Sequence, residues 1–166
     1  MSAQLKLCTA RAYPPLAFRK ACAAFPTGVA VVAIQAVDGS DTGMVINSFA
    51  SVSLQPMLVQ WAVACDAPNY ALYAHTERYG LSLLAANQAA LVPRFTRGGR
   101  KFDGLPVLRS AAAMRWLPGA TAHFCCRVVQ RVPAGDHLLL IGEVTEFAAS
   151  GGAPLLFIGG QLEAWS

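Results

Sequence analysis

The sequence predicts a mainly β fold: a six-stranded antiparallel β-barrel with a few short helices at its periphery. Runs rich in β-branched and aromatic residues, separated by hairpin turn signals, account for most of the expected regular structure. The chain lacks the alternating strand and helix patterns of a parallel sheet, and it has no G-x-G-x-x-G motif that would open a dinucleotide-binding helix. Its 166 residues suit a single domain over 1–166.

The first half of the chain is predicted to contain a loose arm, two helices and three strands. Pro14-Pro15 opens the first helix, since proline is favoured at the first helical position, and Pro26 ends it. Asp38-Gly39 is a strong hairpin signal between two strands. The third strand is apolar throughout, so we expect it to be buried on both faces. In chain order these elements are the arm 1–12, helix 16–24, strands 28–37, 42–49 and 57–65, and helix 69–75.

The second half is predicted to be mainly strand. Two long strands are joined by the Pro133-Ala134-Gly135-Asp136 turn, and a helix and a basic loop precede them. The elements are strand 80–84, helix 87–95, basic loop 94–101, strands 120–132 and 137–147, and a last strand over 154–158, whose extension toward Trp165 is left open.

The composition indicates a homodimer. Hydrophobic residues make up 55% of the chain and charged residues only 13%, so a lone barrel would expose much apolar surface. The apolar runs are shorter than the ~18 residues that span a bilayer, and Arg19 and Lys20 interrupt the stretch that a signal peptide would need. We therefore expect a cytoplasmic protein without membrane association.

The cysteines indicate neither a disulfide framework nor a metal site, because they are odd in number and include no C-x-x-C pair. We expect all of them to be small buried hydrophobes, with the adjacent pair on opposite faces of one strand. The net charge of +4 favours anionic partners such as phosphorylated cofactors. Nucleic acid is disfavoured because the basic residues are not interleaved with aromatic ones. The cysteines are Cys8, Cys22, Cys65, Cys125 and Cys126.

Polar side chains gather in the segment 43–53, which reads GMVINSFASVS. Asn47, Ser48, Ser51 and Ser53 stand beside residues that are otherwise apolar. Serine, asparagine and backbone groups together can bind both the donors and the acceptors of an uncharged heterocycle. From the residues alone, a serine-rich turn between two strands is the more common role of such a segment.

Four motifs occur in order along the chain: FRKACAAFPTGVAVVA, GMVINSFASVSLQPMLVQWAV, GDHLLLIGEV and PLLFIGG. Together they resemble the flavin reductase-like, FMN-binding split-barrel family, which contains the reductase components of two-component flavin monooxygenases. The match runs from about Phe18 to Gly160, and the first two motifs are its most specific part.

The resemblance implies a six-stranded split barrel that forms a homodimer, with the flavin near the subunit interface. It implies that Val45–Ser48 lies along the flavin and its ribityl phosphate, and that Ser51–Ser53 supplies backbone contacts to the isoalloxazine edge. The family usually has Thr-Ala where this chain has Val45-Ile46, so one hydroxyl that could bond flavin is missing and the choice between FMN and FAD could shift. The implied flavin residues here are Val45, Ile46, Asn47, Ser48, Ser51, Val52 and Ser53.

The basic loop is a second place where the chain departs from the family. The family often has Asp-Lys-Phe where this chain has Arg100-Lys101-Phe102, so Lys101 and Phe102 match while Arg100 reverses a charge. With the other arginines of the loop, these residues would form a clamp on a flavin phosphate or a dinucleotide pyrophosphate. A solvated loop that keeps an apolar protein soluble is the alternative.

His137 is the residue for which the resemblance implies a catalytic role. In family reductases the matching histidine lies near the nicotinamide and can hydrogen-bond its carboxamide, although a turn histidine taken alone is more commonly just solvated. The closing motif FIGG carries Phe157 and Gly159, which are implied to lie at the nicotinamide cleft. His75 and His123 have no such support, and we expect them to be structural.

The predicted function is an NAD(P)H-dependent flavin reductase. Hydride would pass from nicotinamide C4 to N5 of FMN, or of FAD, and the reduced flavin would pass to a separate monooxygenase. Hydride transfer needs neither a catalytic triad nor paired carboxylates. The nearest alternative keeps the fold but holds FMN for electron transfer without efficient NAD(P)H oxidation. Two further alternatives are a nucleic-acid-binding barrel and a structural dimer with a vestigial pocket. The choice between NADH and NADPH is left open.

Overall fold

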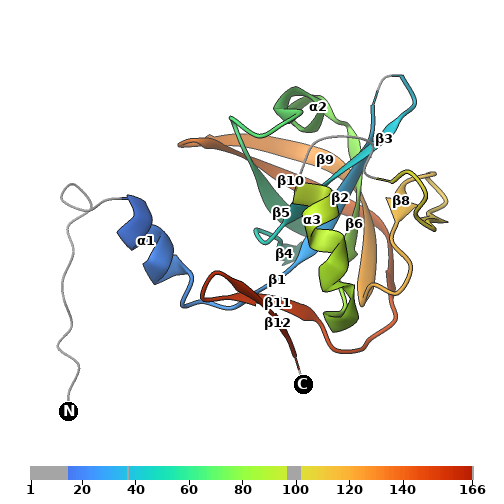
Figure 1. Cartoon of the computed structure of the whole chain (residues 1–166). Coiled ribbons are helices and arrows are strands. Elements are labelled where there is room, and N and C mark those ends of the chain that lie inside the picture. The colour runs from blue at the N-terminus through green and yellow to red at the C-terminus, as the bar shows by residue number, and fades with distance from the viewer. Residues whose placement is uncertain (1–14, 37, 97–101, 166) are drawn as a thin grey trace, which may run out of the picture.

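A seven-stranded antiparallel sheet forms the body of the protein (Figure 1). The computed structural model describes residues 15–36, 38–96 and 102–165, so the expected loose arm 1–12 lies outside the described residues. The strand order is β3-β2-β6-β9-β10-β5-β4, and the mainly β fold expected from the sequence is confirmed. The strands are β2 (Ala30–Gln35), β3 (Asp41–Ile46), β4 (Ala50–Leu54), β5 (Met57–Ala64), β6 (Arg78–Leu83), β9 (Ala122–Ala134) and β10 (His137–Ala149).

Turn chemistry explains the two hairpins that the sequence predicts. Between β2 and β3, Gly39 adopts a φ of 78°, and the backbone N–H and hydroxyl of Ser40 donate to the Asp38 carboxylate at 2.9 and 2.6 Å. Between β9 and β10 the ladder continues up to the residues that flank Gly135-Asp136, so the loop is tighter than the four-residue turn expected. Gly135 has a φ of 64°, which most side chains would strain.

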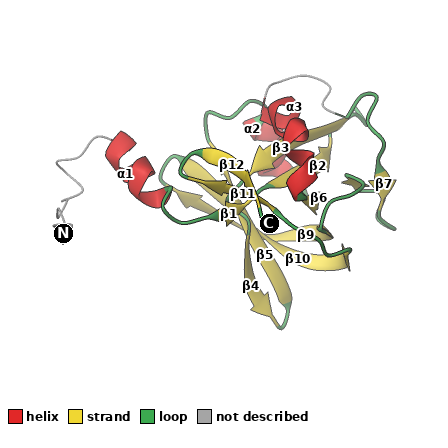
Figure 2. Ribbon diagram, turned by 60° about the horizontal axis from the view of Figure 1, so that its bottom comes forward, coloured by secondary structure: helices red, strands yellow, loops and turns green. Residues whose placement is uncertain are grey.

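The sheet has seven strands where six were expected, because the serine-rich segment after β3 forms a strand of its own. This strand, β4, pairs antiparallel with β5, with Ala50 opposite Gln60 and a register shift between Ser51 and Ser53. The hairpin that β4 and β5 form projects from the rest of the sheet (Figure 2). β4 lies at one end of the strand order and β3 at the other.

Strand β5 corrects the expectation that both of its faces are buried. Trp61 and Val63 are buried, whereas Ala62 between them is only partly buried. β10 shows the same alternation. An antiparallel sheet packs one face on the core and leaves the other open unless another element covers it. The outer face of β5 and β10 is therefore partly exposed and mostly apolar, with Gln60 and Glu143 among its side chains.

Two layers of apolar side chains lie on opposite sides of the sheet. In the inner layer, Trp61 meets the rings of Tyr73 and Tyr79 edge-on, with centroid separations of 5.9 and 5.7 Å. The outer layer covers β2 and is closed by short helices and the C-terminal hairpin (Figure 1). The expected helix 87–95 is divided into η1 and α3. The outer layer is closed by the 3₁₀ helix η1 (Ala86–Leu91), α3 (Val92–Thr96), β11 (Leu155–Ile158) and β12 (Gln161–Ala164), whereas α2 (Tyr70–His75) carries Tyr73 into the inner layer.

The cysteines divide between the core and the surface. Cys125 and Cys126 are buried on opposite faces of β9, as expected, with Cys126 in the inner layer and Cys125 beneath the β7–β8 hairpin. Cys22 and Cys65 are exposed, which corrects the expectation that every cysteine is buried, because Cys22 ends a helix that buries no residue and Cys65 follows the end of β5. Cys8 lies outside the described residues. The small hairpin consists of β7 (Leu108–Arg109) and β8 (Arg115–Trp116).

Helix α1 (Pro15–Cys22) projects away from the sheet (Figure 1). It buries no residue, and Phe18 is 73% exposed. Two backbone contacts fix its end to the body: strand β1 (Thr27–Gly28) pairs with β11, and the N–H of Gly159 donates to the Ala23 carbonyl at 2.9 Å. Within the described part of the chain, no helix has the length and apolar character needed to cross a membrane.

Candidate functional site

Gly43 allows helix α3 to lie against β3. A Cβ atom at this position would be 2.9 Å from a ring carbon of Phe95 and 2.9 Å from one of Phe102, and the centroids of these two rings are 5.0 Å apart. A side chain would therefore have to displace packed rings. The close approach places Val92 and Thr96 of α3 beside the end of β3, where the polar segment begins.

A cavity of about 370 Å³, which we call the β3 cavity, lies where β3, α3 and the β11–β12 hairpin meet. Its side chains are apolar except for the Asn47 amide and the Thr96 hydroxyl. Such a chamber suits a flat, largely uncharged heterocycle with amide-like edges. The cavity brings together four residues expected at the site, although Phe157 is far from the others in sequence. The lining residues are Val29, Val45, Ile46, Asn47, Val92, Thr96, Phe157 and Leu162.

A second cavity, of about 660 Å³, lies between the end of α1 and the β11–β12 hairpin, and we call it the α1 cavity. Asn47 and Phe157 line both cavities, so the two are neighbours. Gly159, expected at the cleft, holds the adjoining turn through its hydrogen bond to Ala23. The lining residues are Arg19, Cys22, Ala23, Phe25, Thr27, Asn47, Phe157 and Gly160.

Arg19, Phe25 and Thr27 were not predicted from the sequence to be site residues. All three belong to the motif FRKACAAFPTGVAVVA, which contributes to the family resemblance but whose residues were otherwise expected only to form a helix and a strand. The signal that could have found them is the motif itself. Its arginine and threonine are not required by the periodicity of either element.

The Ser48 hydroxyl is engaged with the backbone of β5. It accepts the N–H of Ala62 at 3.0 Å and donates to the carbonyl of the same residue at 3.3 Å. These bonds continue the β4–β5 pairing beyond the first residue of β4. Ser48 therefore fixes the path of the chain between β3 and β4.

The β4 residues expected to contact flavin lie at an edge of the sheet. Ser51 and Val52 are exposed, and the Ser53 hydroxyl accepts the N–H of Gln55 at 3.2 Å. In the ladders formed by the described residues, β4 pairs with β5 only. Its other edge therefore presents backbone donors and acceptors to a ligand.

His137 is the first residue of β10, and its side chain is 44% exposed. Its Nδ1 lies 2.7 Å from a carboxylate oxygen of Asp136. Because an ionised carboxylate only accepts, Nδ1 donates to it, and in the neutral tautomer with this proton Nε2 is an acceptor. This hydrogen bond lowers the pKa of Asp136 below its usual range. His137 lines neither the β3 cavity nor the α1 cavity. In the β10–β5 ladder, His137 lies opposite Ala64. Ala64 is two residues after Ala62, whose backbone N–H donates to Ser48.

Phe102 lies in the outer apolar layer rather than beside Asn47. It is 6% exposed and packs against Phe95. The expected neighbours Arg100 and Lys101 lie outside the described residues. Near them, the guanidinium of Arg94 donates to the backbone carbonyl of Asp103. In the structure, Phe102 supports the position of α3.

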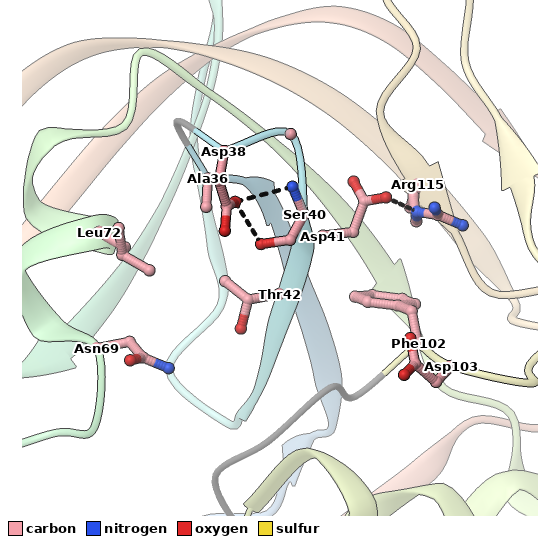
Figure 3. Close-up of a pocket in the computed structure, with 11 residues that line it drawn as sticks. Ala36, Asp38, Ser40, Asp41, Thr42, Asn69, Leu72, Phe102, Asp103 and Arg115 are labelled. Atoms are coloured by element: carbon pink, nitrogen blue, oxygen red, sulfur yellow. Dashed lines mark hydrogen bonds and ion pairs between the residues drawn. The ribbon is translucent and has the colours of Figure 1, made fainter.

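A third cavity, of about 740 Å³, lies at the β2–β3 turn (Figure 3). Four of its polar side chains bond one another in pairs, since Ser40 donates to Asp38 and Arg115 is ion-paired with Asp41. Phe102 is the expected flavin residue that lines it among those described. Its size alone therefore does not make it the flavin site. No group of three or more His, Cys, Asp or Glu side chains in the described chain could hold a metal ion.

Comparisons with known proteins define the class. Residues 22–166 match the flavin reductase like domain. The chain is 40% identical over 149 residues to an FMN reductase (NADH) of Agrobacterium fabrum, covering 90% of this chain and 85% of that protein. It is 35% identical over 153 residues to an NADH-dependent flavin reductase of a Rhodococcus species, covering 90% and 86%. The chain therefore belongs to the flavin reductase-like family, as its motifs indicate.

Solved structures show the same fold. The NADH:FAD oxidoreductase of Streptomyces globisporus, in complex with NAD and FAD fragments, has a TM-score of 0.87 at 28% identity, covering 98% of this chain and 98% of that chain. The flavin reductase of the Pseudomonas putida styrene monooxygenase has a TM-score of 0.80 at 32% identity, covering 90% of this chain and 97% of that chain. These similarities confirm a flavin reductase fold.

Proposed function

We propose that this protein is an NAD(P)H-dependent flavin reductase that passes reduced FMN, or FAD, to a separate monooxygenase. The observation that carries the proposal is the β3 cavity, where Val45, Ile46 and Asn47 meet Phe157. The relatives named as NADH-dependent flavin reductases support the reaction. The similarity to a styrene monooxygenase flavin reductase supports a monooxygenase as the receiver of reduced flavin.

The residues present fit a flavin. The β3 cavity, at about 370 Å³, lies within the roughly 300–1,000 Å³ that small-molecule sites occupy. Its apolar walls would hold the ring system, Asn47 would bond an amide-like edge, and the open edge of β4 at Ser51–Ser53 would add backbone contacts. When bound, the flavin accepts at N5 the hydride that nicotinamide carries at C4. We retain Arg100 and Lys101 as proposed phosphate ligands.

His137 orients the nicotinamide in this proposal. Asp136 holds the ring so that Nε2 accepts a hydrogen bond, and the N–H of a carboxamide is a matching donor. Hydride transfer needs no proton from His137, so its loss should disturb nicotinamide alignment rather than flavin binding. Ser48 links His137 to the β3 cavity. It directly follows Asn47, which lines the cavity, and it hydrogen-bonds to β5, the strand that pairs with His137.

The proposed functional unit is a cytoplasmic homodimer of split barrels. The outer face of β5 and β10 carries Ala62, Leu139 and Ile141, all partly exposed. Among the described elements, β10 makes its main contacts with β9 and β5. A second copy would cover this apolar face. The end strands β3 and β4 are consecutive in the chain, as suits a curved sheet whose two ends approach each other. Nicotinamide nucleotides are cytoplasmic metabolites, which favours that compartment.

Steady-state oxidation of NADH and NADPH, with FMN and FAD in turn as acceptors, tests the proposed function. We expect nucleotide oxidation that depends on added flavin. Phe157→Ala should raise the flavin Kd about tenfold or more, because it removes an aromatic wall of the β3 cavity. Phe147→Ala is the matched control, since Phe147 is 61% exposed on β10 and lines neither cavity. Tight FMN binding without oxidation of either nucleotide would instead indicate an electron-transfer flavoprotein.

A further inference from the structure

The α1 cavity is lined by polar side chains that the fold does not use. Arg19, Thr27 and Asn47 line it. None of these three side chains forms a hydrogen bond or an ion pair with another described residue. Arg19 and Asn47 are exposed and can bond water, whereas a buried group such as the Thr27 hydroxyl normally has a partner within the protein. This unpartnered buried hydroxyl, beside two polar side chains that the fold does not use, points to a ligand.

Thr27 gives the clearest sign. Its hydroxyl oxygen is buried and has no hydrogen-bond partner among the described residues. Its backbone is held in β1 opposite Phe157, so the hydroxyl is fixed beside the aromatic ring that lines both cavities. An unpaired buried hydroxyl lowers stability, and a ligand atom that pairs with it removes that cost.

Arg19 differs from most of the described arginines. The others with side-chain partners are Arg94, Arg109, Arg115, Arg127 and Arg131. Among the described residues, only Arg19 and Arg78 lack such a partner, and Arg78 lines neither the β3 nor the α1 cavity. The described lining of the α1 cavity includes no acidic side chain. A guanidinium whose forked N–H donors are free is suited to a phosphate.

Aromatic walls complete the site. Phe25 and Phe157 both line the α1 cavity, whose volume of about 660 Å³ exceeds that of the β3 cavity. Aromatic faces stack on flat heterocycles. The cavity thus combines a guanidinium, a hydroxyl, an amide and aromatic surface, which together match the phosphate, ribose and ring of a nucleotide.

We propose that the α1 cavity is a nucleotide subsite in which Arg19 binds a phosphate and Thr27 hydrogen-bonds an adjoining ribose or amide group. The proposal rests on the proposed function, because Asn47 and Phe157 join this subsite to the β3 cavity. The phosphate comes from the flavin or from the nicotinamide nucleotide, which present the same chemistry to Arg19.

Equilibrium titration with FMN and with riboflavin, which lacks the phosphate, tests the flavin source without turnover. If Arg19 binds the flavin phosphate, Arg19→Ala raises the Kd of FMN about tenfold or more and leaves that of riboflavin unchanged. Arg19→Lys should recover part of the FMN affinity, because it keeps the charge and loses the fork.

NADH and 1-benzyl-1,4-dihydronicotinamide, a hydride donor without phosphate, test the nicotinamide source. If Arg19 binds the phosphates of NADH, Arg19→Ala raises the KM for NADH about tenfold or more and leaves the rate with the phosphate-free donor unchanged. Calorimetric binding of NAD⁺ gives the same contrast without turnover. Lys20→Ala and Arg78→Ala remove cations that do not line the cavity, and both should stay within about twofold of the wild type.

Thr27→Val separates a ligand contact from a structural one. The substitution removes an unpaired buried hydroxyl and nearly conserves volume, so the melting temperature of the ligand-free protein should stay the same or rise. Binding of the nucleotide that depends on Arg19 should weaken several-fold. A lower melting temperature with unchanged affinity would count against the ligand contact.

The proposal is supported if Arg19→Ala weakens binding only of the phosphate-bearing ligand, either in the flavin titrations or in the nicotinamide experiments. The experiment that shows this loss identifies which nucleotide supplies the phosphate. Equal effects on phosphate-bearing and phosphate-free ligands, or no effect in either arm, overturn it. Failure of the proposed function is recognised separately, because the wild type would then not oxidise NADH with any flavin. The flavin titrations would still report on Arg19 in that case.

Discussion

Hydroxyl and imidazole side chains in this protein serve different roles according to their surroundings. The Ser48 hydroxyl is satisfied by the backbone of β5, whereas the Thr27 hydroxyl is buried without a partner among the described residues. His123 is buried and stacks on Trp116 with ring centroids 5.1 Å apart, whereas His137 is partly exposed at a turn. Burial and pairing, rather than residue type, separate the structural groups from those available to a ligand.

Ser48→Ala should destabilise the protein and loosen the site. The substitution leaves the N–H and carbonyl of Ala62 without the partner that they have now, at a cost of about 1–3 kcal/mol in the free energy of unfolding. Denaturant titration measures this cost. Ser51→Ala is the matched control: Ser51 is exposed, and no hydrogen bond is seen for its hydroxyl within the described chain. Equal stability of the two variants would contradict the role given to Ser48.

Stability should fall as the pH is lowered past the ordinary pKa of histidine, in part because of His123. Burial lowers the pKa of His123 in the folded protein, so the unfolded chain binds the proton more readily. The contribution is therefore complete above about pH 6.5 and is lost as the pH falls below that value. Between about pH 8 and pH 5, the denaturation midpoint of the wild type should fall more steeply than that of His123→Phe if this group is responsible. Parallel curves would exclude it.

At the scale of elements, the site depends on two close approaches. Gly43 lets α3 lie on β3, and the Gly159 to Ala23 hydrogen bond holds the end of α1 against the β11–β12 hairpin. Each contact joins segments distant in sequence, and each borders one of the two neighbouring cavities. The cavities therefore exist only when helices and hairpin are docked on the sheet.

Gly43→Ala should displace α3 and weaken flavin binding. The new methyl group would meet the packed rings of Phe95 and Phe102, which costs about 1–3 kcal/mol of stability. Because Val92 and Thr96 of α3 line the β3 cavity, the FMN Kd should rise as well. Thermal unfolding and FMN titration measure the two effects. Gly28→Ala is the control, since a Cβ at position 28 meets nothing within 4 Å. The account would be contradicted if Gly28→Ala lost FMN affinity while Gly43→Ala kept it.

At the scale of the whole molecule, the partly exposed outer face of β5 and β10 is the surface on which the proposed dimer would form. Leu139→Asp places a charge on this face and should convert the dimer to a monomer, because an unpaired carboxylate is costly to bury. Sedimentation velocity measures the assembly state. Leu108→Asp, at a position 48% exposed on β7, should remain dimeric. A monomeric wild type, or a dimeric Leu139→Asp variant, would show that the interface lies elsewhere.

The parts of the fold that depend on local chemistry could be predicted from the sequence. Both turns, at Asp38-Gly39 and Gly135-Asp136, and helix α2 follow from residues that are adjacent in the chain. Strand β4 and the β7–β8 hairpin were not predicted, because short strands are set by the neighbour that pairs with them. The prediction that both faces of β5 are buried was wrong for one face, because the elements that cover a strand come from elsewhere in the chain.

The candidate site was predicted in part. The motif resemblance led to Val45, Ile46, Asn47 and Phe157, which the structure gathers around one cavity. Sequence periodicity could not identify Arg19 and Thr27 as site residues. Their side chains are seen to lack partners among the described residues only when α1, β1 and β11 are placed together.

Anaerobic stopped-flow mixing of the FMN-loaded protein with NADH, and separately with NADPH, tests the central claim most directly. We predict rapid bleaching of the visible flavin absorbance with at least one nucleotide. His137→Ala should slow this bleaching about 10–100-fold and leave the FMN Kd unchanged, because the proposed function gives His137 the role of aligning the donor, and His137 does not line the β3 cavity. Flavin that binds but stays oxidised with both nucleotides would contradict the account.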